Sequence, residues 1–335
     1  IILFQSGSIS EEKSANSIVT LREGSASDDR ITLELGCLYL NYRLKNLIVQ
    51  FNQTDPDYRI KVTEYAPGYP EVNLDLDTAL MKMNTDLIAG NIPDILCLNE
   101  EMPFSAYAAR GLFEDLTPYL SAEPEYKLVK AAETALKSAD GKLYRIAKAF
   151  DILTYVGDSE IVGDEPGWTF KDVDSALASN PGKQLFLDSA TQSSALNVII
   201  RINLPDYIDW STGDVNIDSP DFIKLLEWAK SFPTGKYTSI SSVPGYSDGE
   251  LLGMSTKIDS FKEFLVYNAI TEDRISFKGF PSDTRQGSTL WVVDTPLSMS
   301  AKCSHKDGAW RFMKNILTEE YYCPPGSISM GFPIV

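Results

Sequence analysis

Carboxylates and aromatic rings are the residues of this chain most able to do chemistry. The sequence holds 47 acidic residues but one histidine, His305, among charged neighbours just before a predicted helix. A catalytic triad is therefore disfavoured, and a metal site built from several histidines is excluded. A two-carboxylate glycosidase stays open, because any two of the acids could meet in space. No motif points to one, so we predict no catalytic residue and no cofactor.

Metal and disulfide sites are also disfavoured by spacing. The four cysteines show no CxxC pair, and we expect isolated, buried thiols. Residues 209–218 space their oxygens like a calcium loop, but Asp214 stands where that loop needs glycine and Pro220 where it needs glutamate. We therefore predict no metal site. The cysteines are Cys37, Cys97, Cys303 and Cys323.

Length and charge narrow the classes of partner. The 335 residues suffice for one large or two ordinary domains, and 43% of them are hydrophobic, which fits a globular protein. The net charge of −17 disfavours nucleic acid or an anionic membrane as the main partner, because phosphate binding needs basic patches. No apolar run approaches the 18 residues of a transmembrane helix. Residues 1–30, rich in Ser, Gly and charge, are predicted to form a flexible arm or tether.

The hydrophobic periodicity predicts a parallel α/β sheet. Strands are expected at 31–35, 59–65 and 93–98, with helices at 43–52 and 75–89 between them. This βαβαβ order is typical of an open sheet with helices on its faces. Further helices are expected at 105–111, 127–137, 169–179 and 307–317, and one begins at Pro220 and includes Ala229. Further strands are expected at 142–147, 151–157, 184–187, 275–280 and 296–300.

Aromatic and acidic residues follow several of these strands. Tyr39 and Tyr42 come after the first strand, Phe104 after the third, and Trp291 precedes Asp294. In open α/β sheets, ligands bind beyond the carboxyl ends of the strands. A ring can pack on the C–H face of a sugar while nearby polar groups take its hydroxyls. The grouping therefore favours a sugar-binding site.

In order and spacing, these segments resemble the carbohydrate-binding group of extracellular solute-binding proteins of bacterial ABC importers, which includes the maltose-binding protein. The resemblance covers roughly residues 31–335. Its most telling block is AGNIPDILCLNEEMPFSAYAARGLFEDLTPYL at 89–120. Two others are DGKLYRIAKAFDILTYVG at 140–157 and PLSMSAKCSHKDGAWRFMKNILTEE at 296–320.

The resemblance implies a periplasmic-binding-protein type II fold, with two α/β lobes and a ligand cleft between them. On this basis we expect the first lobe at 31–150 and about 275–315, and the second at 151–274 and about 316–335. It implies a binding protein, not an enzyme, that is a monomer and delivers a carbohydrate to an ABC permease. It also implies an extracellular or periplasmic location, with a lipid anchor on an upstream segment and further helices beyond Val335.

The resemblance also assigns candidate ligand-binding residues, position by position. They come from the loops after the first and third strands, the strand between the lobes and three segments of the second half. They are Tyr39, Asn41, Tyr42, Asn99, Glu100, Glu101, Phe150, Asp151, Asp188, Gln192, Ser255, Trp291 and Asp294.

Two departures leave the ligand open. The segments holding Gln192 and Ser255 lack the stacking aromatics that relatives carry there, although Lys257 and Asp259 fall nearby. The proline of the family's GK-x-Y-x-x-P segment is also missing; Ala147 or Lys148 stands in its place. A peptide or polyamine ligand therefore stays an alternative, as does a binding module or glycan-active enzyme of a larger surface protein.

Overall fold

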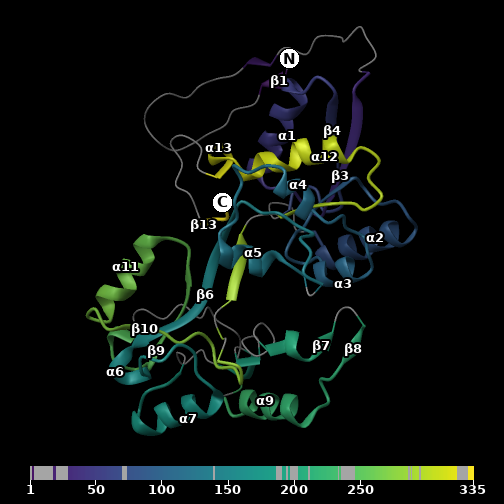
Figure 1. The fold of residues 1–335 in the computed structure, drawn as a ribbon. Helices are drawn as coiled ribbons and strands as arrows, with labels where there is room; N and C mark the ends of the chain where they lie inside the picture. Colours follow the sequence, from purple (N-terminus) through teal and green to yellow (C-terminus); the bar gives the residue numbers. More distant parts are fainter. Residues whose placement is uncertain are drawn as a thin grey trace.

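Two larger sheets, one of four and one of five strands, organise the chain, and the longest strand of the five-stranded sheet runs between the two lobes (Figure 1). The protein is described here from a computed structural model. It describes residues 2–3, 18–19, 29–69, 74–138, 140–185, 191–193, 195–196, 203–209, 212–232, 234, 246–285, 287, 289–293, 296–322 and 331–335. Within residues 1–30, which were predicted to form a flexible arm, the structure describes residues 29–30 and two short strands. These strands, β1 (Ile2–Leu3) and β2 (Ile18–Val19), pair antiparallel.

The first sheet confirms the predicted βαβαβ unit. Its strand order is β12-β5-β3-β4, with β3 parallel to both β4 and β5 and with β12 antiparallel to β5. The helices α1 and α2 are the two crossovers. The elements are β3 (Ile31–Cys37), α1 (Tyr42–Thr54), β4 (Tyr58–Glu64), α2 (Leu76–Ile88), β5 (Ile95–Cys97) and β12 (Leu297–Met299).

This sheet buries both faces, so each face has its own core. Successive side chains of a strand point to opposite faces. Ile95 and Cys97 join the core that contains Phe51 and Phe312, whereas Leu96 between them joins a second core with Met83. The remaining elements of this lobe are α3 (Phe104–Ala109), α4 (Thr117–Ser121), α5 (Lys130–Leu136), α12 (Lys306–Met313), η2 (Lys314–Leu317) and α13 (Glu319–Tyr322).

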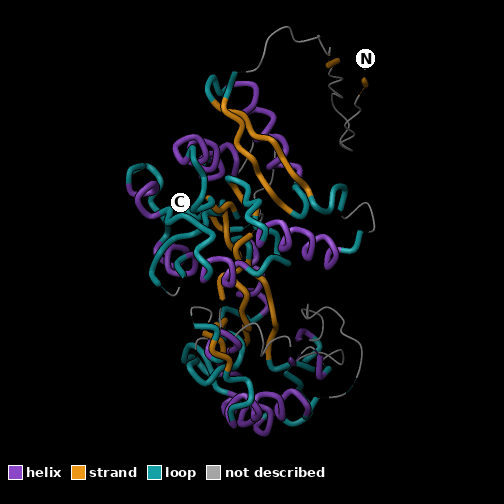
Figure 2. Tube along the Cα trace, turned by 90° about the vertical axis from the view of Figure 1, so that its right-hand side faces the viewer, coloured by secondary structure: helices purple, strands orange, loops and turns teal. Residues whose placement is uncertain are grey.

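The strand β6 (Ala149–Asp158) runs from this lobe into the other. Its first half pairs with β11 (Thr289–Val293) and β13 (Phe332–Pro333). Its second half pairs with β9 (Gly253–Ile258) and β10 (Ile275–Phe277). Figure 2 shows the result, an elongated molecule in which strands connect the two lobes.

The second lobe packs around large aromatic side chains. Trp168 is buried, contacts the Tyr155 ring at 5.1 Å between centroids, and donates from Nε1 to the Gly279 carbonyl at 2.8 Å. Thr169 caps α7 in a capping box with Asp172, as the sequence suggested for this threonine. The elements are α6 (Ser159–Val162), α7 (Phe170–Ser179), η1 (Leu204–Asp206), β7 (Ile208–Asp209), β8 (Asp214–Val215), α9 (Pro220–Lys230) and α11 (Phe261–Ile270).

Several segments differ from the expectation. Residues 142–147, predicted as a strand, make only isolated bridges, such as Ile146 to Leu297. Strand β10 pairs with β6 in the five-stranded sheet instead of joining the first lobe. Ile316 and Leu317, expected in the second lobe, lie in the core of the first because η2 follows α12 directly and continues its buried face.

Asp158, the last residue of β6, forms an ion pair with Arg274. Asp158 accepts hydrogen bonds from Nε and Nη2 of Arg274 at 2.9 and 2.6 Å, and its Oδ1 also accepts from the backbone N–H of Glu160 at the start of α6. The Arg274 hydrogen bonds hold the pKa of Asp158 below its ordinary value. A lowered pKa means that the unfolded state binds the proton more tightly, so this group stabilises the native state above its unfolded pKa.

We predict that Asp158→Asn lowers the urea midpoint at pH 7 while still capping α6, because the amide accepts from the Glu160 N–H but cannot pair with Arg274. The difference from the wild type should shrink as the pH falls through the lowered pKa of Asp158. Circular dichroism during urea unfolding measures this. The control is Glu272→Gln, which removes an exposed partner of the same arginine at 3.2 Å. Equal effects of both variants, or a difference independent of pH, would contradict the prediction.

Candidate functional site

The loop after β3 and the loop after β5 are tied together by Asn99. Its Oδ1 accepts from the backbone N–H of Leu38 at 2.9 Å, and its Nδ2 donates to the carbonyl of Tyr39 at 3.0 Å. Asn99 is 3% exposed. This candidate ligand residue therefore has its amide engaged with the backbone, where it positions its neighbours.

Tyr39 lies between an aromatic ring and two acids. Its ring centroid is 4.9 Å from that of Tyr69, and its hydroxyl donates to Glu101 at 3.4 Å. Burial, with the charges of Glu101 and Glu100, raises the pKa of Tyr39 to about 12. The hydroxyl is therefore a neutral donor at physiological pH, beside two exposed carboxylates that can accept hydrogen bonds. Tyr69, in the turn after β4, is a member of this group that the sequence reasoning missed.

The other two residues of the first loop differ in role. Asn41 is the N-cap of α1, and its Oδ1 accepts from the backbone N–H of Leu44 at 2.8 Å. Tyr42 begins the helix and is 73% exposed. An exposed ring of this size at the end of a parallel strand is available to a ligand, whereas the amide oxygen of Asn41 serves the helix.

Asp151, on β6, is a deeply buried carboxylate. It is 1% exposed, and its Oδ2 pairs with Nζ of Lys257 on β9 at 2.9 Å. Its Oδ1 is buried and has no hydrogen-bond partner among the described residues. Burial raises the pKa of Asp151, and Lys257 opposes that rise. An orphan acceptor of this kind costs free energy unless a donor reaches it, which singles out Asp151 among the predicted residues.

The neighbours of Asp151 show how tightly this stretch is packed. Phe150 lies in the core of the first lobe and contacts the Phe332 ring at 5.7 Å, so the structure uses this candidate for packing. Gly331 faces Asp151, and a Cβ at that position would come within 3.1 Å of Oδ1. Gly331 has a φ of +85°, which suits glycine in any case.

The remaining candidates come from the second half of the chain. Ser255 is half-buried on β9 opposite Tyr155, and Nε2 of Gln192 donates to the carbonyl of Lys230 at the end of α9. Trp291 is opposite Asp151 in the β6–β11 register; its backbone alone is described. Asp188 and Asp294 lie outside the described residues. Most of the described candidates thus fall in two groups, one at the ends of β3 and β5 and one on β6 and the strands paired with it, whereas Gln192 lies beside the end of α9.

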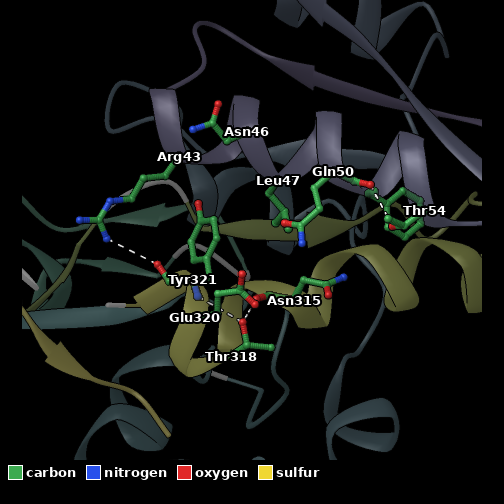
Figure 3. A pocket seen from close by; sticks show the side chains of 10 residues that line it. Arg43, Asn46, Leu47, Gln50, Thr54, Asn315, Thr318, Glu320 and Tyr321 are labelled. Carbon is green, nitrogen blue, oxygen red and sulfur yellow. Dashed lines mark hydrogen bonds between the residues drawn. The ribbon is translucent and has the colours of Figure 1, made fainter. Parts of the chain in front are cut away.

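Two pockets in the first lobe contain none of the ligand residues assigned by the resemblance, although Phe104, one of the aromatic residues expected after the third strand, lines the second. One, of about 320 Å³, lies between α1 and the η2–α13 segment (Figure 3). Arg43, on its rim, donates to the carbonyl of Tyr322 at 3.0 Å. The other, of about 470 Å³, lies beside Arg145. The first is lined by polar groups of Asn46, Gln50, Thr54, Asn315, Thr318 and Glu320, among others.

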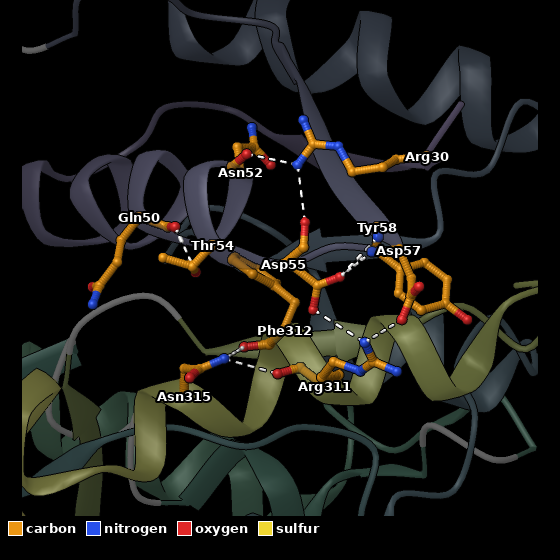
Figure 4. Close-up of polar contacts among 10 residues, drawn as sticks. All are labelled: Arg30, Gln50, Asn52, Thr54, Asp55, Asp57, Tyr58, Arg311, Phe312 and Asn315. Atoms are coloured by element: carbon orange, nitrogen blue, oxygen red, sulfur yellow. Dashed lines mark hydrogen bonds and ion pairs between the residues drawn. The ribbon is translucent and has the colours of Figure 1, made fainter. Parts of the chain in front are cut away.

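A polar network next to the first pocket fixes α12 against the α1–β4 turn (Figure 4). Arg311 donates to Asp55 at 3.2 Å and to Asp57 at 3.0 Å, with its guanidinium 5.1 Å from the Tyr58 ring. Arg30 donates to the carbonyls of Asn52 and Asp55. These groups satisfy one another, so we assign the network to stability.

The described residues contain no group of His, Cys, Asp and Glu side chains able to hold a metal ion. Cys37, Cys97 and Cys303 are free, buried thiols, and Cys323 lies outside the described part. The expectation of isolated cysteines is wrong for Cys37 and Cys97, because a hydrogen bond between their side chains, together with burial, raises the pKa of Cys37. Burial raises the pKa of Cys303 to about 12, which makes it a poor nucleophile. Within the same ranges, no helix has the length and apolar character to cross a membrane.

Comparison with protein families gives a match over most of the chain. The model of the bacterial extracellular solute-binding proteins matches residues 46–324. The comparison with curated protein sequences finds no match.

Solved structures with the same two-lobed fold are also similar. A family 1 extracellular solute-binding protein from Alicyclobacillus acidocaldarius is 14% identical, with a TM-score of 0.50 over 92% of this chain and 80% of that one. The bacterial solute receptor AcbH is 15% identical, with a TM-score of 0.52 over 88% of this chain and 77% of its own. AcbH is described as having an exclusive preference for β-D-galactopyranose.

We predict that Asn99→Ala destabilises the first lobe by about 1–3 kcal/mol, because it leaves the buried N–H of Leu38 and carbonyl of Tyr39 without partners. Urea unfolding followed by circular dichroism measures the loss. Asn91→Ala, an exposed asparagine just after α2, is the matched control and should change the stability by less than about 0.5 kcal/mol. Equal stability of Asn99→Ala and the wild type would show that the loops do not depend on this amide.

Proposed function

This chain belongs to the family of bacterial extracellular solute-binding proteins, and from that premise we propose that it is a receptor for a small carbohydrate. The sugar binds between the two lobes, and the loaded receptor delivers it to an ABC permease. The receptor acts as a monomer held near the membrane by a lipid anchor on an upstream segment. No covalent step is required, because capture and release suffice.

The main support for this proposal is Oδ1 of Asp151, which is buried and has no hydrogen-bond partner among the described residues. A buried carboxylate oxygen without a partner gains most from a donor that can reach it, and a sugar offers several hydroxyl donors. Asp151 lies on β6, the strand shared by both lobes. A ligand held there is within reach of groups from either lobe. Lys257, which occupies the other carboxylate oxygen, orients Asp151 and opposes the rise in its pKa that burial causes.

The Tyr39 group supplies a second element of sugar recognition. Tyr39, Tyr69 and the exposed Tyr42 provide ring faces, and Glu100 and Glu101 provide acceptors at the ends of β3 and β5. Rings for the C–H face and carboxylates for the hydroxyls are the combination that a sugar needs. The preference of AcbH for galactopyranose supports the same class of ligand.

The proposed mechanism is a population shift between an open and a closed arrangement of the lobes. A ligand that contacts both lobes only in the closed state stabilises that state by its differential affinity. The lobe division proposed for this motion follows the two sheets, with β6 and the strands paired to it as the connection. The permease would then recognise the closed form.

A cationic ligand, such as a polyamine, is the second candidate. Glu100, Glu101, Asp151 and Asp259 all fall in the proposed site, while Lys257 neutralises one of them. An excess of carboxylates favours amine ligands over neutral sugars. The two candidates differ in salt dependence, because the binding of a polyamine weakens as salt screens its charges.

The decisive experiment is a thermal-shift titration with monosaccharides, oligosaccharides, peptides and spermidine. A ligand that binds only the native state stabilises it by about 2.7 kcal/mol at a hundredfold excess over Kd. We expect a rise in Tm with one class of sugar and none with spermidine. A shift with spermidine alone would select the second candidate. Release of sugar from a polysaccharide, abolished by Glu100→Gln or Asp151→Asn, would instead indicate an enzyme.

We predict that Asp151→Asn weakens binding of the sugar found in this panel by roughly 10- to 150-fold, since a hydrogen bond to a charged group contributes about 1.5–3 kcal/mol. Isothermal titration calorimetry measures the change. Asp174→Asn, which removes an exposed charge on α7, is the control and should bind like the wild type. Wild-type affinity in Asp151→Asn would move the sugar site away from β6.

A further inference from the structure

We propose that the cavity beside Arg145 is a second ligand site, which binds small carboxylates. The cavity measures about 470 Å³, within the usual range for small-molecule sites, and lies in the first lobe between α3 and the segment that leads from α5 to β6. None of the residues in the proposed sugar site lines it. Its polar and aromatic lining includes Phe104, Ser105, Lys137, Ser138, Asp140 and Arg145.

Arg145 brings a charge that the described residues leave uncompensated. Its guanidinium carbon lies 4.1 Å from the centroid of the Phe104 ring, and its Nε is buried without a hydrogen-bond partner. Within the described ranges no carboxylate pairs with it. Burial lowers the pKa of Arg145 to about 10, so the group stays protonated at pH 7 although it is partly desolvated. A desolvated cation beside an open cavity favours an anion there.

The other charges at the cavity are already paired. Lys137 contacts Glu133 at 2.6 Å. Asp140 accepts from the Tyr144 hydroxyl at 2.7 Å and from the backbone N–H of Lys142 at 3.1 Å. These contacts direct both groups toward protein partners, which leaves Arg145 as the cation available to a ligand in this part of the structure.

The chemistry around Arg145 fits a carboxylate. A guanidinium presents its N–H groups as a planar fork that matches the two oxygens of a carboxylate. Ser105 and Ser138 add hydroxyl donors, and Phe104 with Ala108 gives the cavity an apolar wall. A small acid with a hydroxylated or apolar body, of the size of a sugar acid, meets each of these groups.

The test is calorimetric titration of the full chain with D-glucuronate and, separately, with D-glucose and inorganic phosphate. We expect glucuronate to bind with one-to-one stoichiometry and glucose not to bind at this site. Arg145→Gln should weaken glucuronate binding at least about tenfold, the loss expected for a charge-assisted pair. Lys142→Gln, with the same change of charge on an exposed neighbour, should stay within about twofold of the wild type.

Two further variants separate this site from the others. Ala109→Trp fills the cavity from an exposed position and should abolish glucuronate binding with Arg145 intact, which covers the case that Arg145→Gln fails to fold. Asp151→Asn should leave glucuronate binding unchanged, so failure of the sugar proposal and failure of this one are distinguishable. No glucuronate binding at millimolar concentration, tighter binding of phosphate, or binding that survives both Arg145→Gln and Ala109→Trp would overturn the proposal.

Discussion

The backbone hydrogen bonds of β6 hold together the five-stranded sheet that connects the two lobes. Its ten residues pair antiparallel with strands from three other parts of the chain: β9 and β10, then β11, then β13. Because one strand carries these ladders, residues brought from distant parts of the sequence meet around its middle. Asp151, Lys257 and Gly331 come together in this way. A ligand bound at a strand shared by both lobes can contact both of them, so its affinity depends on how the lobes are arranged.

The helices that the sequence predicted are those whose apolar stripe matches the face that they bury and whose cap residues mark their ends. Helices α1, α7 and α9 have amphipathic stripes and side-chain caps at Asn41, Thr169 and Ser219, and all three were predicted. The helix α11 was missed because its apolar residues do not gather on one buried face; Phe261 and Leu265 are both largely exposed. Strand β9 was missed because its sequence, GMSTKI, lacks the strict alternation of a half-buried strand and owes its extended form to pairing with β6.

The sequence does not show the tertiary contacts of a side chain, and these contacts decide whether it is available to a ligand. The resemblance placed Asn99, Phe150 and Asp151 together as ligand residues, yet Asn99 joins two loops, Phe150 packs in the core, and Asp151 alone keeps an orphan oxygen. Arg145, five residues before Phe150, was not predicted as a ligand residue. The sequence does not show whether a charged side chain has a partner of opposite charge in the fold. Spacing indicates which residues follow a strand, whereas hydrogen-bond partners decide which of them remain free for a ligand.

We propose that a sugar bound at β6 draws the two lobes together. Small-angle X-ray scattering of the full chain, with and without a saturating amount of the sugar that raises Tm, tests it most directly. Closure predicts a smaller radius of gyration with the sugar, and Asp151→Asn at the same sugar concentration should keep the larger value of the free protein. A sugar that binds the wild type one-to-one while the radius of gyration stays unchanged would show that the lobes do not close around it.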